Sequence, residues 1–197
     1  MRPKQKPKGK EPQCESMKIK LSPELSYLIG FWRKRKTYEG LGILGSTDLQ
    51  EIFIKEALDK KIITTDKIIQ DDKKAFFHHT AYKKFFLEVE YDQLERFKYL
   101  NEYAANYLAG LFDSVAEVDE KGRIVVIKSN QQDEMLLIRL GFGALRTKGK
   151  LIVGKPIAFL TFIKKYVKRH KDHKIFEYVS GKKKGAKKDV APKNEKN

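Results

Sequence analysis

Two segments of the chain carry the same order of apolar and polar positions. Each begins with a strongly apolar stretch that contains a glycine, Gly30 in the first and Gly110 80 residues later. A turn and a strand candidate follow in each copy, at residues 40–45 and 123–128, and then small polar residues of the kind that begin helices. This repetition predicts two copies of one structural unit.

The two copies continue in parallel downstream. Residues 67–79 and 144–155 each predict two short strands around a polar tip. An apolar helix is predicted after each hairpin, at residues 80–89 and 156–167. Each half therefore has the predicted order helix, strand, helix, strand, strand, helix. We expect residues 94–107 to carry helix into the second copy.

The repeat defines the expected domain organisation. We predict an α+β protein whose halves cover residues 21–92 and 93–170, with the two glycine-bearing helices packed against each other. Gly30 and Gly110 lack a Cβ atom, so two such helices can cross at short distance. Residues 1–20 are predicted to be a disordered basic arm, and residues 171–197 a Lys-rich basic tail.

Charge is concentrated at the two ends of the 197-residue chain, whose formal net charge is +16. Residues 1–20 carry a net +5 and residues 164–197 a net +9, which leaves only +2 for the region between them. Cationic arms of this kind suit nonspecific contact with phosphates, and their alternative role is to keep the protein in solution.

Composition excludes several classes of protein. No apolar run approaches the roughly 18 residues that span a bilayer, so we expect no membrane contact. The first residues offer no apolar core for a signal peptide, and the single cysteine, Cys14, makes an internal disulfide impossible. We therefore predict a cytoplasmic protein.

Residues 108–116, LAGLFDSVA, resemble the LAGLIDADG motif of homing endonucleases, and residues 28–36, LIGFWRKRK, look like a divergent first copy. The resemblance covers residues 21–168. It implies two αββαββα-type halves related by a pseudo-twofold axis, with antiparallel saddle sheets that grip nucleic acid. It also implies that a single chain acts as a monomer, because the symmetry is internal.

The resemblance also locates the family's catalytic acids. In that family an acidic residue at the end of each motif helix binds a divalent metal, usually Mg²⁺, and the matching positions here are Arg35 and Val115. Valine has no ligand atom and arginine repels a dication. We therefore expect no cleavage and no cofactor. The alternative is residual Mg²⁺-dependent cleavage through the nearby acid Glu117.

Cations occupy several positions where nucleic acid would lie in that family. Four are consecutive at the end of the first motif helix, where they form either a phosphate-binding cluster or a solvated helix end. The strand candidate at residues 40–45 has no polar side chain with which to recognise a base. The predicted nucleic-acid-binding residues are Arg33, Lys34, Arg35, Lys36, Arg123, Lys128, Arg146, Lys148 and Lys150.

Other candidate sites are weaker. His170 and His173 have the spacing of a metal-binding pair, but they lie in a lysine-rich segment without a third ligand, so we predict an exposed arm there. His78 and His79 are adjacent in a strand candidate and point to opposite faces.

The sequence as a whole predicts a protein that binds nucleic acid without cutting it. Poor base-reading strands and long Lys-rich arms favour structured RNA, as in a ribosome-associated protein or an intron-splicing partner. The alternatives are a DNA-binding transcriptional regulator, a residually active nuclease and a module that binds another protein.

Overall fold

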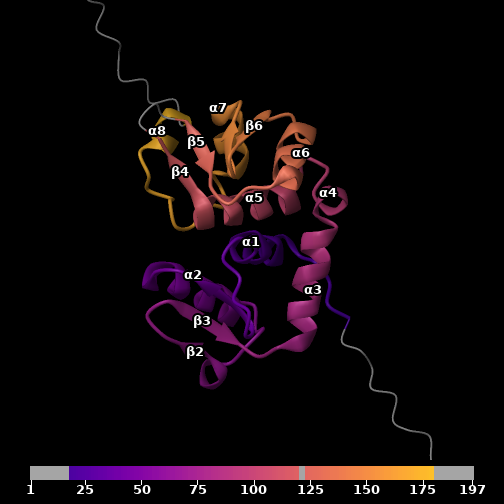
Figure 1. Cartoon of the computed structure of the whole chain (residues 1–197), viewed down its shortest axis with the longest axis vertical. Helices are drawn as coiled ribbons and strands as arrows, with labels where there is room; N and C mark the ends of the chain where they lie inside the picture. The colour runs from indigo at the N-terminus through magenta and orange to yellow at the C-terminus, as the bar shows by residue number, and fades with distance from the viewer. Residues whose placement is uncertain (1–17, 120–122, 180–197) are drawn as a thin grey trace, which may run out of the picture.

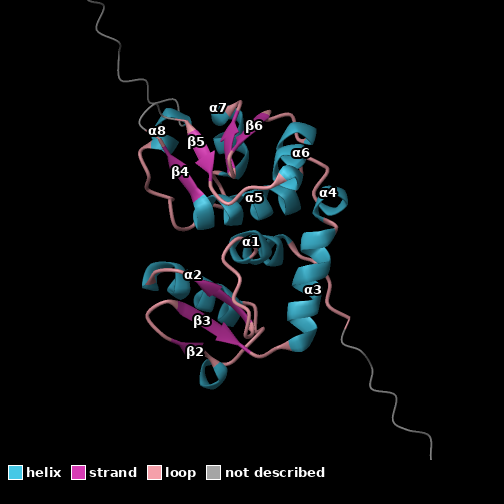
Figure 2. Cartoon of the chain, viewed as in Figure 1, coloured by secondary structure: helices cyan, strands magenta, loops and turns pink. Residues whose placement is uncertain are grey.

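The structure, a computed structural model, describes residues 18–119 and 123–179. It has a mixed α+β fold, as the sequence predicts. Each half holds one small antiparallel sheet with helices around it, and two helices, α1 (Pro23–Trp32) and α5 (Glu102–Val115), lie between the halves (Figure 1; Figure 2).

The remaining elements follow the order that the sequence pattern predicts, and the second half has one additional strand directly after its central helix. After α1, the first half contains β1 (Leu41–Leu44), α2 (Thr47–Asp59), a 3-10 helix (Thr65–Lys67), β2 (Ile69–Gln70), β3 (Lys74–Phe77) and α3 (Thr80–Tyr91). The short helix α4 (Gln93–Arg96) connects the halves. After α5, the second half contains β4 (Ala116–Val118), β5 (Ile124–Val126), α6 (Gln131–Arg139), β6 (Ala144–Thr147), β7 (Lys150–Val153), α7 (Pro156–Ile163) and α8 (Ile175–Val179).

The two sheets have matching strand orders. The second sheet has the order β4-β5-β7-β6, and the first has β1-β3-β2. An isolated antiparallel bridge between Lys36 and Ile43 stands beside β1, at the place that β4 takes beside β5. The first sheet is therefore the same arrangement with its first edge strand reduced to one bridge.

Polar caps fix where the central helices begin. The Ser22 side chain accepts a hydrogen bond from the backbone of Leu25, and Pro23 occupies the first turn of α1. At α5, the Asn101 side chain accepts from the backbone of Ala104. The continuous helix predicted for residues 94–107 is therefore not formed. Residues 97–101 are not helical, and α4 and α5 are separate helices.

The contact between α1 and α5 is as close as two helix backbones allow. A Cβ atom built on Gly30 would lie 2.0 Å from the carbonyl oxygen of Tyr107, and one on Gly110 would lie 2.0 Å from that of Tyr27. The relation is reciprocal, with each glycine meeting the tyrosine three residues before the other glycine. A side chain at either position would therefore force the helices apart.

The core is continuous across this contact. Residues 25–32 of α1 and 104–115 of α5 are all buried, because these helices are covered by both halves. Trp32 packs edge-on against Phe86 of α3, and Phe112 of α5 does the same with Phe176 of α8. The two halves therefore fold around one shared core.

The C-terminal boundary differs from the sequence prediction. Helix α7 ends at Ile163 rather than at residue 167. The predicted tail from residue 171 begins too early, because α8 lies within it and buries Ile175 and Phe176 in the core. Residues 1–17 of the predicted N-terminal arm and 180–197 of the tail lie outside the described residues. Within the described part of the chain, no helix is long and apolar enough to cross a membrane.

The close crossing yields a stability prediction. Gly30→Ala or Gly110→Ala should lower the free energy of unfolding by about 2 kcal/mol or more, because the new methyl group would overlap a backbone carbonyl. Thermal and urea unfolding followed by circular dichroism measure this loss. Glu51→Ala, at an exposed position of α2, is the control and should change stability little. Near wild-type stability of both glycine variants would contradict the crossing.

Candidate nucleic-acid interface

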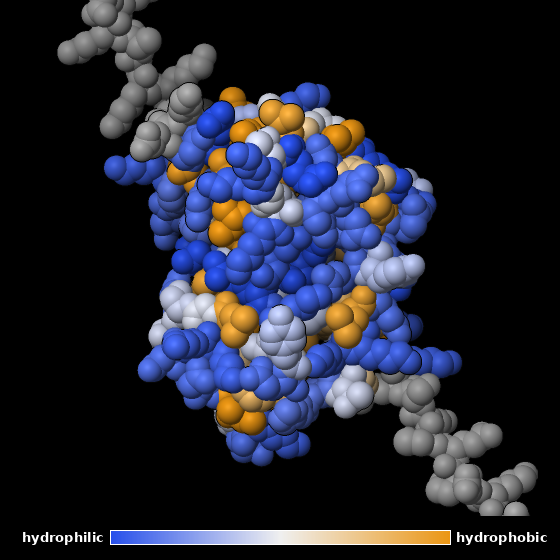
Figure 3. Space-filling view, viewed as in Figure 1, coloured by the Kyte–Doolittle hydropathy of each residue, from blue (hydrophilic) through white to orange (hydrophobic). Residues whose placement is uncertain are grey.

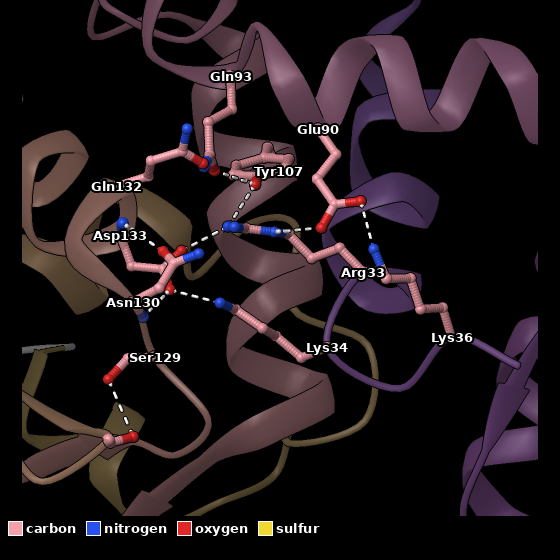
Figure 4. Close-up of polar contacts among 11 residues, drawn as sticks. Arg33, Lys34, Lys36, Glu90, Gln93, Tyr107, Ser129, Asn130, Gln132 and Asp133 are labelled. Carbon is pink, nitrogen blue, oxygen red and sulfur yellow. Dashed lines mark hydrogen bonds and ion pairs between the residues drawn. The ribbon is translucent and has the colours of Figure 1, made fainter.

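The four consecutive cations at the end of α1 do not form one surface. The Arg33 side chain is buried, and its Nη1 donates to Tyr107 Oη at 2.8 Å and to Asp133 Oδ1 (Figure 4). Lys34 Nζ donates to the other carboxylate oxygen of Asp133 at 2.6 Å. Asp133 also completes the N-terminal cap of α6 with Asn130. Arg33 and Lys34 therefore fasten α1 to the start of α6.

The environments of these two cations confirm a structural role. Burial alone would lower the pKa of Arg33, but Tyr107, Asp133 and Glu90 raise it, so the guanidinium stays charged. Burial and the neighbouring charge of Arg33 lower the pKa of Lys34. Neither side chain is available to a phosphate, which corrects the expectation of a four-residue phosphate cluster.

Lys36 lies on a different side of the helix end. Its Nζ is 2.8 Å from Glu90 Oε2 and 5.5 Å from the centre of the Trp32 ring. Glu90 is shared, because its other oxygen is 3.9 Å from Arg33 Nε. The Lys36 side chain remains partly exposed, so it can still meet an anion at the surface.

Arg35 points into a cavity of about 380 Å³ at the end of α5. Its Nε donates to the carbonyl oxygen of Ser114 at 2.8 Å, and its two terminal nitrogens have no hydrogen-bond acceptor among the described residues. Polar side chains from the end of α1, from α5, from β4 and from the segment between α7 and α8 line the cavity. They are Arg35, Ser114, Glu117, Arg169, His170 and His173.

A buried carboxylate holds the segment between α7 and α8 against the end of α5. Asp113 is fully buried and accepts hydrogen bonds from the backbone nitrogens of Lys168, Arg169 and His170, at 2.7 to 3.1 Å. His170 Nδ1 lies 3.1 Å from the same carboxylate. Figure 1 shows this segment passing along the side of the molecule where α5 ends. The segment is exposed at His173, as predicted, but it is not a free arm, because Asp113 binds its backbone and His170 is half-buried.

Asp113 also receives a hydrogen bond from the first half. Tyr27 Oη donates to its Oδ2 at 2.8 Å. Burial and the charge of Asp113 raise the pKa of Tyr27, so the phenol stays protonated and continues to donate. A single carboxylate thus joins α1, α5 and the cavity-lining segment.

Arginines and carboxylates both surround the cavity. Burial, followed by the charge of Arg169, lowers the pKa of Arg35, whereas Asp48 and Glu117 oppose the shift. Arg169 is itself held by Asp48 at 2.9 Å and by the carbonyl oxygen of Asp113 at 3.3 Å. Arg35 is therefore the arginine of the lining whose terminal nitrogens are left to meet an anion.

The same donor set does not fit a magnesium ion. Val115, at the position of one family acid, lines the cavity and has no ligand atom, and Arg35 occupies the other position. Glu117 alone supplies a carboxylate there. Within residues 18–119 and 123–179, no group of three His, Cys, Asp or Glu side chains could hold a metal ion.

All five cations predicted on the strands are exposed, and two of them are also paired. Arg123 Nε donates to Asp119 at 2.7 Å, and Arg146 Nε donates to Glu134 at 3.2 Å. The remaining three are exposed lysines: Lys128, Lys148 and Lys150. Lys148 and Lys150 lie on either side of Gly149 at the tip of the β6–β7 hairpin. Lys148 and Gly149 have positive φ angles. The tip of this hairpin therefore presents two exposed positive charges.

The sheet face turned away from the core offers little for reading bases. Glu117, Val125, Ile152 and Leu145 pair in register across the four strands of the second sheet and so lie on one face. Three of these four are apolar, and Leu145 is 63% exposed. Thr147 and Lys150 form the next pair on this face toward the hairpin tip, so hydrogen-bonding side chains stand near the tip and are scarce at the centre of the face.

Sequence reasoning missed Ser114, Arg169, His170 and His173 as cavity residues. The histidine pair was visible as a spacing, but nothing local shows that Asp113, more than 50 positions earlier, binds the backbone before it. An acidic residue inside an apolar motif helix was the available signal. Such a residue requires hydrogen-bond donors from elsewhere in the chain.

The Asp113 anchor yields a second stability prediction. Asp113→Asn should lower the free energy of unfolding by about 2 kcal/mol, because an amide cannot replace a carboxylate that accepts several donors. It should also expose the chain near Arg169 to trypsin. Asp172→Asn, at an exposed position in the same segment, is the matched control. Equal stability and equal cleavage of the two variants would contradict the anchor.

No protein-family model matches the chain, and none of the curated proteins matches it either.

Proposed function

We propose that this protein binds structured RNA through its phosphates, without cutting it, on a catalytically degenerate LAGLIDADG endonuclease fold. One observation carries the proposal: Arg35, Arg169, His170 and His173 line a single cavity at the ends of the two central helices. In the family that the sequence resembles, metal-binding acids stand at this place. Here an anion-binding group has replaced them.

Two features of the architecture support the resemblance. The halves repeat the order of their elements, and their sheets have matching strand orders around α1 and α5. The glycines of the two motif-like segments stand at the crossing itself, where only glycine can be accommodated. Both features go beyond what a shared α+β class would require.

The cavity chemistry supports binding rather than cleavage. Metal-assisted hydrolysis of a phosphodiester needs ions held beside the attacking and leaving oxygens. Val115 and Arg35 cannot hold such an ion, and a lone Glu117 beside two arginines is a poor ligand set. The arginines instead supply the planar donor groups that suit phosphate.

The surface favours RNA over a long duplex DNA site. The centre of the outward face of the second sheet is mainly apolar, and the first sheet exposes Leu44 and Ile69 on its strands. Figure 3 shows hydrophilic side chains across the middle of one face, where the halves meet, with smaller apolar patches above and below. Contacts from such a surface depend on backbone shape more than on base sequence. Duplex DNA is the second candidate, because the β6–β7 hairpin presents Lys148 and Lys150 at its tip.

A binding and cleavage assay tests the proposal. The full chain is titrated into labelled structured RNA and into duplex DNA of equal length at several salt concentrations, with and without Mg²⁺. We expect tighter binding to RNA, affinity that falls linearly on a logarithmic salt scale, and intact nucleic acid on a denaturing gel.

Two outcomes of this assay contradict the proposal. Cleavage that requires Mg²⁺ and disappears in Glu117→Gln would make the protein a nuclease. Dissociation constants for both nucleic acids far above micromolar near physiological salt would favour a protein-binding role instead.

The hairpin tip gives a separate prediction. Lys148→Ala combined with Lys150→Ala should weaken RNA binding. It should also reduce the magnitude of the slope of log affinity against log salt concentration by up to about two, because fewer counterions are released when fewer phosphates are contacted. Fluorescence anisotropy over a range of salt concentrations measures the slope. Lys55→Ala combined with Lys67→Ala removes the same charge at exposed positions in the first half and should have the smaller effect. Equal slopes in the two double variants would show that the tip makes no specific contact.

A further inference from the structure

The cavity is too small for a passing strand of nucleic acid. Its volume of about 380 Å³ lies near the lower end of the range for small-molecule pockets. The walls come from four separate parts of the chain, at Arg35, Ser114, Glu117 and residues 169–173. The cavity can hold one group that projects from a nucleic-acid chain, and the rest of that chain would lie on the surface around the cavity.

The cavity donors are fixed by contacts of their own. Arg35 is oriented by its Nε bond to the Ser114 carbonyl oxygen, which leaves its two terminal nitrogens without an acceptor. His173 Nδ1 accepts the backbone N–H of Ile175 at 3.2 Å, so its proton is on Nε2. His170 Nδ1 lies 3.1 Å from a carboxylate oxygen of Asp113, which fixes the orientation of this ring. Donors held in this way need little rearrangement when an anion binds.

A buried hydroxyl in the cavity wall has no partner. Ser114 is 1% exposed, and its Oγ makes no hydrogen bond in the part of the chain that the structure describes. A buried polar group without a partner is unfavourable and rare in native proteins. An oxyanion bound beside Ser114 would supply the missing acceptor. This observation is independent of the charges and favours a ligand that carries an acceptor oxygen.

The shape of the ligand distinguishes two kinds of phosphate. A backbone phosphodiester lies within the chain and has two free oxygens, whereas a terminal phosphomonoester projects from the chain and has three acceptor oxygens. Arg169 is bound to Asp48 and to the carbonyl oxygen of Asp113, so among the described residues that line the cavity the terminal nitrogens of Arg35 are the arginine donors left for a ligand. The three oxygens of a projecting group can meet Arg35 and His173 together, which favours the terminal phosphate.

We propose that this cavity binds the terminal phosphate of an RNA chain, so that the protein recognises a phosphorylated RNA end. The inference rests on the proposed function, since it names the part of the RNA that enters the site. Arg35 and the Nε2 atom of His173 hold the phosphate oxygens, and Ser114 Oγ donates to one of them. The exposed lysines contact the chain that follows.

A matched set of RNAs tests the inference. One hairpin sequence is prepared with a 5′-phosphate, with a 3′-phosphate, and with hydroxyl groups at both ends, and each is titrated by fluorescence anisotropy. We expect one of the phosphorylated forms to bind about tenfold tighter than the hydroxyl form, and inorganic phosphate to remove this difference. Equal affinity of all three RNAs would overturn the inference while leaving RNA binding intact.

Variants connect the preference to the cavity. Arg35→Gln should bring the ratio of the affinity for the preferred phosphorylated RNA to the affinity for the hydroxyl RNA close to one. Ser114→Ala, which keeps the carbonyl contact with Arg35, should reduce the ratio several-fold. The double variant Lys148→Ala, Lys150→Ala is the control, because it should weaken all three RNAs by the same factor and preserve the ratio. A full preference in both cavity variants would contradict the assignment.

A titration with inorganic phosphate tests the phosphate site independently of RNA binding, so that a failure of one proposal can be distinguished from a failure of the other. In a ¹⁵N-labelled sample of the full chain, the amide signals of Ser114 and of residues 169–173 should shift in a saturable manner, and Arg35→Gln should abolish the shift. This result would support the phosphate site even if the RNAs did not bind. Absence of any shift in the wild-type protein would overturn it.

Discussion

The structure depends on the crossing of α1 and α5 at two glycines. Each backbone lies where the Cβ atom of the other helix would be, so the helices meet without intervening side chains at their centre. Both helices are buried along nearly their whole length, and each half folds its sheet and outer helices around one of them. The same contact brings the ends of α1 and α5 together and so creates the cavity between them.

Beside the crossing, matched positions of the repeat carry opposite charges. Arg33 and Asp113 are 80 residues apart, and each bonds the tyrosine of the other helix, Tyr107 and Tyr27 respectively. Arg33 then recruits Asp133 at the start of α6, whereas Asp113 recruits the backbone before α8. Because the charges at these matched positions are opposite, Arg33 forms an ion pair with Asp133, whereas Asp113 binds backbone nitrogens of the segment that lines the cavity.

The sequence predicted the fold far better than the site. Repeated glycines, hairpin tips and caps are local signals, so the order of elements, the α+β class and the glycine contact could be predicted. The roles of Arg33 and Lys34 could not, because their partner Asp133 is about 100 residues away and also belongs to a helix cap. A separation of 57 residues likewise hid the docking of His170, whose segment has the composition of a solvated tail but is held by backbone hydrogen bonds to Asp113.

We propose that cations at the end of the two core helices bind RNA, at the place where the endonuclease family that the sequence resembles holds metal. Ultraviolet crosslinking of the native protein in its own cells tests this proposal when the attached nucleic acid is sequenced and the attached peptides are identified by mass spectrometry. We expect structured RNA attached to peptides around Arg35 and residues 168–174. Recovery of genomic DNA sites, or of nucleic acid attached only to peptides far from the cavity, would contradict it.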